Sequence, residues 1–95
     1  MLPTEKVRET VDQILTTQLG ESFEHAEIRI GEDHSGDKAL FIKAFFKPRA
    51  LFPSGRVSNH AATQLRFRLL DQGDERFPYL NMGYPPESPR VRLDE

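Results

Sequence analysis

The chain has 95 residues, with 13 lysines and arginines against 15 aspartates and glutamates, and it contains no cysteine. This length allows one small hydrophobic core and excludes a large enzyme fold with a deep cleft of its own. Without cysteine, disulfides and thiolate metal sites are excluded. No stretch approaches the roughly 20 apolar residues that cross a bilayer, and the first residues lack a secretory pattern. We therefore expect a cytoplasmic protein with no membrane partner.

The charges are distributed unevenly along the chain. Residues 1–24 hold five acidic and two basic residues, whereas residues 39–70 hold no acidic residue at all. This second segment, which we call the basic block, contains Lys43, Lys47, Arg49, Arg56, Arg66 and Arg68. Such a block either docks something negative or pairs internally with its acidic neighbours, and the sequence leaves both alternatives open.

The first predicted element is a helix over residues 5–19. Apolar residues recur there at the spacing of three to four that forms one stripe on a helix, namely Val7, Val11, Ile14, Leu15 and Leu19. Gly20 follows as a stop signal, and the Thr4 hydroxyl is placed to cap the first turn.

A hairpin is predicted next. Ala26, Ile28 and Ile30 alternate with polar residues, which is the pattern of a strand wetted on one side. Residues 31–38 contain two glycines and three acidic residues, as is typical of a turn. A second strand follows over residues 39–47.

The two faces of this second strand differ in kind. One face carries Leu40, Ile42, Ala44 and Phe46, and the other carries Phe41, Lys43, Phe45 and Lys47. A fully wet face does not need two phenylalanines, and a fully buried face does not tolerate two lysines. We therefore expect a partner to cover the mixed face; the alternative is shielding by the tail or by a second copy.

The rest of the chain predicts a second helix and a last strand. Ser54 is a candidate N-cap for a helix that ends near Gly73, and its apolar stripe is Val57, Ala61, Ala62, Leu65 and Leu69. Asp74 and Glu75 are expected to be solvated in the loop that follows. Residues 77–84 are expected to form the last strand, and Pro78 indicates that it is an edge strand or one that starts late. Residues 85–95 are expected to be a mobile, proline-rich, charged tail.

These elements predict an α+β fold in one domain, residues 1–84, ordered helix, strand, strand, helix, strand. Each helix has one apolar side, so both are expected on one face of a three-stranded mixed sheet. A right-handed crossover makes the last strand parallel to the second. The other face would then carry the mixed set together with Arg29 and Tyr79.

Two resemblances bear on function. The element order resembles that of small ribosome-binding factors with the second type of KH fold, which implies RNA binding, although the Gly-x-x-Gly loop of those proteins is absent. Residues 33–40, reading DHSGDKAL, and residues 76–80, reading RFPYL, resemble short uncharacterised prokaryotic proteins. This second resemblance implies an accessory or antitoxin-like subunit that docks on a partner.

The sequence favours a non-catalytic role without a cofactor. No two of the three histidines share a helical face, and no glycine-rich phosphate loop occurs. Asp33, His34 and Asp37 are weak candidates for a metal site, and a solvated acidic turn is the preferred interpretation.

Our leading hypothesis is docking of a protein partner, either another protein or a second copy. The expected contact residues are Phe41, Lys43, Phe45, Lys47 and Tyr79. The alternative is binding of RNA or single-stranded DNA, because bases stack on aromatic rings while cations follow the phosphates. The residues expected to bind nucleic acid are Lys43, Lys47, Arg49, Arg56 and Arg66.

Overall fold

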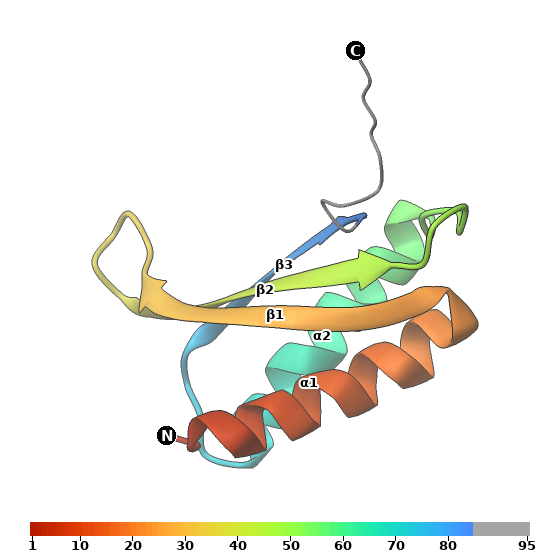
Figure 1. The fold of residues 1–95 in the computed structure, drawn as a ribbon. Coiled ribbons are helices and arrows are strands. Elements are labelled where there is room, and N and C mark those ends of the chain that lie inside the picture. The colour runs from red at the N-terminus through yellow and green to blue at the C-terminus, as the bar shows by residue number, and fades with distance from the viewer. Residues whose placement is uncertain (85–95) are drawn as a thin grey trace.

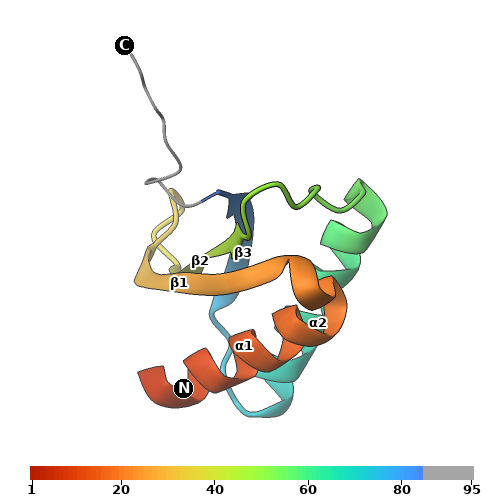
Figure 2. The same cartoon turned by 45° about the vertical axis from the view of Figure 1, so that its right-hand side comes forward.

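The computed structural model describes residues 1–84, and the predicted tail lies outside this part of the chain. The element order is the predicted one (Figure 1). The elements are α1 (Thr4–Leu19), the short 3-10 helix η1 (Gly20–Ser22), β1 (Phe23–Glu32), β2 (Lys38–Phe46), α2 (Gly55–Asp71) and β3 (Phe77–Gly83). Both helices pack on the same face of a three-stranded mixed sheet, which confirms the predicted fold class (Figure 2).

Helix α1 turns its predicted apolar stripe towards the core. The residue that ends the helix is the predicted one, whereas the residue that caps its start is not. It begins at Thr4 itself, so Pro3 is the capping residue and the Thr4 hydroxyl makes no capping bond, which corrects the sequence expectation. The Pro3 carbonyl instead accepts the N–H groups of Lys6 and Val7. At the other end Gly20 has φ +67°, a conformation that favours glycine and stops the helix as predicted.

The strand order is β1-β2-β3. β1 runs antiparallel to β2, and β3 runs parallel to β2, as the crossover rule predicts. β1 is longer than expected and carries an irregularity between Phe23 and His25. β2 ends at Phe46, one residue earlier than predicted, so Lys47 follows the strand and its N–H donates to the Ser22 carbonyl at 2.9 Å.

The core lies between the helices and the sheet. The residues of β2 that face it are Leu40, Ile42, Ala44 and Phe46, which confirms the predicted register. They pack against the stripe of α1 and against Ala61, Leu65 and Leu69 of α2. The Ser54 hydroxyl accepts the N–H of Val57 at 3.4 Å, so the predicted cap of α2 is confirmed. Within residues 1–84 no helix is long and apolar enough to cross a membrane.

The loop between α2 and β3 contains a buried ion pair that the sequence did not reveal. Asp74 is fully buried, which corrects the expectation of a solvated carboxylate. Its Oδ1 accepts the N–H of Arg76 at 3.1 Å and the Nε of Arg76 at 2.9 Å, and its Oδ2 accepts the N–H of Leu2 at 3.2 Å. Arg76 Nη2 donates to Asp74 Oδ2 and also to the Leu2 carbonyl, the latter at 3.1 Å. The pair therefore fastens the start of the chain to the base of β3.

Candidate functional site: the outer face of the sheet

The sheet face away from the helices, here called the outer face, is built from rows of residues that the strand register places side by side. Arg29, Phe41 and Tyr79 share one row. Glu27, Lys43 and Asn81 share the next row, and His25, Phe45 and Gly83 share the one after it. Aromatic and charged rows thus alternate along the strands, and within residues 1–84 no helix packs on this side (Figure 1).

The first of these rows extends beyond the sheet into a longer series of contacts, which we call the arginine–aromatic row. The Arg29 guanidinium lies 4.4 Å from the centroid of the Phe41 ring, and Phe41 stacks on Tyr79 with ring centroids 5.5 Å apart. Tyr79 is followed by the tilted ring of Phe77 at 4.8 Å, and the Arg66 guanidinium of α2 lies 4.6 Å from that ring. An arginine therefore closes the row at each end.

The rings of this row are not equally covered. Arg29 lies over the Phe41 ring and Phe41 stacks on Tyr79, whereas Phe77 meets Tyr79 at a tilt of 46° and is 42% exposed. Phe41 and Tyr79 are accordingly half-buried. Flat stacking of a nucleic-acid base on Phe41 or Tyr79 would compete with these contacts, whereas apolar side chains can pack against the ring surface that remains exposed.

Phe45 lies differently from Phe41. Its ring stacks on His25 with centroids 4.7 Å apart, and the Lys43 ammonium lies 5.4 Å from its centroid. The side chain is only 4% exposed. The expectation that a partner must cover both phenylalanines is thus wrong at Phe45, because neighbouring side chains of the same chain already cover it.

A hollow of about 310 Å³ opens on the outer face. Arg29, Phe41 and Lys43 line it together with Glu27 and Asn81. Within residues 1–84 neither Arg29 nor Lys43 forms an ion pair. The hollow therefore combines two cations, one carboxylate and one aromatic residue, and this net positive lining suits an anionic group carried on an apolar surface.

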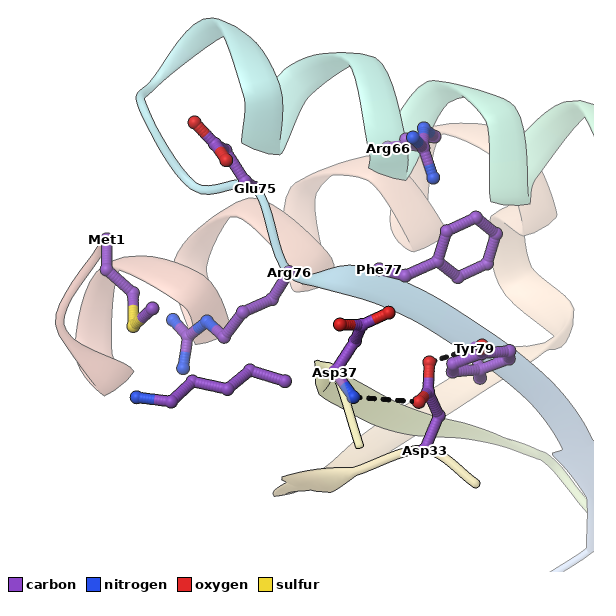
Figure 3. Close-up of a pocket in the computed structure, with 9 residues that line it drawn as sticks. Met1, Asp33, Asp37, Arg66, Glu75, Arg76, Phe77 and Tyr79 are labelled. Atoms are coloured by element: carbon purple, nitrogen blue, oxygen red, sulfur yellow. Dashed lines mark hydrogen bonds between the residues drawn. The ribbon is translucent and has the colours of Figure 1, made fainter. Parts of the chain in front are cut away.

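A second hollow of about 410 Å³ lies where β3, α2 and the β1–β2 turn meet (Figure 3). Its lining contains side chains of both charge signs, and these are Asp33, Asp37, Glu75, Lys38, Arg66 and Arg76. Because both signs are present, the composition of this lining does not favour a cation or an anion.

Asp33 organises the turn between β1 and β2 beside this second hollow. Its Oδ1 accepts the N–H of Asp37 at 3.0 Å, and its Oδ2 accepts the Tyr79 hydroxyl at 3.2 Å (Figure 3). The same Oδ1 also accepts the N–H of Ser35 at 2.9 Å. The bond from Asp37 contributes most to holding the pKa of Asp33 below its ordinary value. The pKa of Tyr79 is raised, first by desolvation and then by its bond to Asp33.

These bonds bear on the metal candidates. Both carboxylate oxygens of Asp33 already accept bonds from the protein. Asp33, His34 and Asp37 do not form a group able to hold an ion, and the described part of the chain contains no other such group.

The structure separates the residues predicted to bind nucleic acid. Lys47 and Arg49 lie in the loop after β2, and Arg56 lies in the first turn of α2. Arg66 is ten residues further along α2, which at 1.5 Å per residue is about 15 Å away, and it is engaged with Phe77. Lys43 projects from the centre of the outer face. Within residues 1–84 no member of the basic block forms an ion pair, so internal pairing does not neutralise it there.

Sequence reasoning missed the contacts made by His25, Arg66 and Phe77. His25 lies directly opposite Phe45, and Phe77 lies on the same face of its strand as Tyr79 because the two are two residues apart. Strand alternation could therefore have placed both residues on the outer face. The Arg66–Phe77 contact joins a helix to a strand, and no pattern within either segment of the sequence indicates it.

No protein-family model matches the chain, and no curated protein or solved structure shows significant similarity to it.

Proposed function

We propose that this protein is a non-catalytic docking subunit that binds another protein through the outer face of its sheet. The observation that carries the proposal is the hollow lined by Arg29, Lys43 and Phe41. A partner presenting a carboxylate on an apolar surface would form charge-assisted hydrogen bonds with the two cations and would pack against the exposed ring surface. Such a role agrees with the accessory or antitoxin-like character that the sequence resemblance implies, and with action in the cytoplasm.

Charge favours a different protein over a second copy on this face. Around the hollow, Arg29 and Lys43 outnumber the single carboxylate of Glu27. Two identical cationic surfaces placed face to face repel each other, whereas a surface of opposite sign attracts and steers its partner. The partner of this face is therefore expected to be acidic at its contact surface.

The test compares Lys43→Glu with the matched control Lys6→Glu. The control makes the same charge change at an exposed position of α1, away from the outer face. Tagged variants are produced at native level in the source cells, co-purifying proteins are quantified, and the recovered pair is reconstituted for calorimetry. We expect wild type and Lys6→Glu to bind one protein in fixed stoichiometry, and Lys43→Glu to weaken binding by about tenfold or more. Equal affinities of the two variants for the partner would refute the assignment of this face, and the absence of any stoichiometric protein would refute docking.

Nucleic-acid binding is the second candidate, because the basic block has no ion pair within residues 1–84. Its cations are Lys43, Lys47, Arg49, Arg56, Arg66 and Arg68. The test is fluorescence anisotropy with labelled single-stranded RNA and DNA at several salt concentrations. Binding through phosphates requires log affinity to fall with log salt by about 0.7 for each phosphate neutralised. Affinity that is absent at low salt, or indifferent to salt, eliminates this candidate.

A further inference from the structure

The free edge of β1 is the longest unpaired strand edge in residues 1–84. β1 spans Phe23–Glu32 and has β2 on one side only, with α1 packed beneath it (Figure 1 and Figure 2). The other edge of the sheet is β3, which is shorter and contains Pro78, a residue without a backbone N–H to donate. An open edge presents a row of backbone N–H and C=O groups that can pair with a further strand.

The side chains along this edge are complementary to themselves. On the outer face, Glu27 and Arg29 are two residues apart and opposite in sign. We propose that β1 pairs antiparallel with β1 of a second copy of this chain, with the two-fold axis at Ile28. This register sets Glu27 of each copy opposite Arg29 of the other, and it joins the two sheets into one of six strands. Directly opposed charges of opposite sign stabilise such a pair.

On the helix side of the sheet the same register joins apolar residues. Ile28 faces its own counterpart, and Ile30 faces Ala26 of the other copy. Ile30 is 48% exposed in the single chain, and Ile28 is partly exposed. Pairing removes this apolar surface from water, which adds to the hydrogen bonds of the new ladder.

Neighbouring registers are disfavoured by charge. A shift of the pairing register by one residue would set outer-face residues of one copy opposite helix-side residues of the other. The nearest registers that keep the faces matched therefore have the two-fold axis at Glu27 or at Arg29. The first opposes the two copies of Glu27, and the second opposes the two copies of Arg29. In the Ile28 register, like charges meet only at the ends, where Glu24 faces Glu32, so the paired segment is expected to span residues 25–31.

Charges on an edge strand often serve the contrary purpose of preventing association. Such protection comes from prolines, inward-pointing charges, β-bulges or cover by a helix or loop. The irregularity of β1 lies between Phe23 and His25, at the end of the strand and not within the segment proposed to pair. Over residues 25–31 there is no proline, the residues facing the helices are Ala26, Ile28 and Ile30, and the outer-face charges have opposite signs. The pattern therefore favours pairing across a two-fold axis.

The test is a charge swap followed by sedimentation equilibrium of the full chain. Wild type should be a dimer that dissociates on dilution. Glu27→Arg and Arg29→Glu each place like charges opposite one another twice, and each should weaken the dimer by about tenfold or more. Two combinations should restore it: the double variant Glu27→Arg/Arg29→Glu, and an equimolar mixture of the two single variants, whose heterodimer again has opposite charges across the axis. Circular dichroism confirms that each variant is folded.

Two controls separate this edge from the outer-face hollow, whose lining also includes Glu27 and Arg29. Lys43→Gln, which places no like charge opposite Glu27, should leave the dimer unchanged, whichever way it affects partner binding. Because the chain has no cysteine, Ile28→Cys introduces one thiol, which should form an intermolecular disulfide across the axis on oxidation, whereas Lys43→Cys should not. A wild-type monomer at all concentrations overturns the proposal. A dimer that persists in both single variants overturns it as well, because that dimer must use another surface.

Discussion

Replacing Asp74 with alanine should destabilise the fold more than any single surface change. The substitution leaves the Arg76 guanidinium without its counter-charge, although that residue is only 7% exposed, and it leaves the N–H of Leu2 without its acceptor. Removing one partner of a buried ion pair costs about 3–5 kcal/mol. Small domains have a total unfolding free energy of about 5–15 kcal/mol, so the variant should lie near its unfolding threshold.

Urea denaturation followed by circular dichroism measures this loss. With an m value of about 1 kcal/mol/M, the unfolding midpoint should fall by about 3 M or more. The matched control is Glu75→Ala, which removes the exposed neighbouring carboxylate and should change stability by less than about 0.5 kcal/mol. The double variant Asp74→Leu/Arg76→Met, which replaces both charges, should be more stable than Asp74→Ala alone. Equal midpoints for Asp74→Ala and Glu75→Ala would show that the buried pair contributes nothing.

The same pair predicts a pH dependence. Hydrogen bonds from the Arg76 side chain are the largest cause of the lowered pKa of Asp74. A lowered pKa in the folded state contributes stability that is fully present above the unfolded value of about 3.9. This contribution is lost as the pH falls through the lower folded value. Stability of Asp74→Ala should therefore depend less on pH than that of wild type between about pH 5 and pH 2, and parallel profiles would contradict this account.

Three further predictions concern local structure. Ser54→Ala removes the cap of α2 and should lower the free energy of unfolding by about 1 kcal/mol in thermal or urea unfolding, whereas Ser54→Asp should retain most of that stability. An unchanged stability of Ser54→Ala would show that the 3.4 Å contact does not act as a cap. Gly73 has φ +91°, so Gly73→Ala should lower the free energy of unfolding by about 1–2 kcal/mol in the same unfolding measurements. An unchanged free energy would mean that the turn adopts another conformation. Asp33→Asn should lower the pKa of Tyr79, measured by phenolate absorbance in a Tyr84→Phe background, because the hydroxyl loses its charged acceptor. An unchanged pKa would show that Asp33 contributes nothing to the raised value.

Much of the fold could be predicted because its signals are local. The spacing of Val7, Val11 and Leu15 identifies one helix face, and strand alternation places Leu40, Ile42 and Phe46 towards the helices. Ser54 and Gly20 mark a helix start and a helix end by the chemistry of single residues. The one misplaced cap is Thr4, because α1 begins one residue earlier than the pattern indicates and Pro3, whose side chain cannot accept a hydrogen bond, occupies the cap position.

The candidate site could be predicted only in part. Phe41, Lys43 and Tyr79 lie on the outer face, as the alternation of side chains along a strand indicates. This alternation assigns a side chain to a face of the sheet but does not say which neighbours bury it there. Phe45 shares the parity of Phe41, yet it is buried because His25 lies opposite it and stacks on its ring. The basic block, contiguous in sequence, is divided in space because α2 carries Arg66 away from Lys47 and Arg49.

The sequence by itself determined the type, order and buried faces of the helices and strands, since these depend on residues a few positions apart. Only the tertiary structure decided that β1 is a free edge, that Arg66 closes an aromatic row, and that Asp74 and Arg76 hold Leu2 from more than 70 positions along the chain. The physical reason is that strand order and charge pairing depend on which distant segments meet, and no local periodicity encodes that meeting.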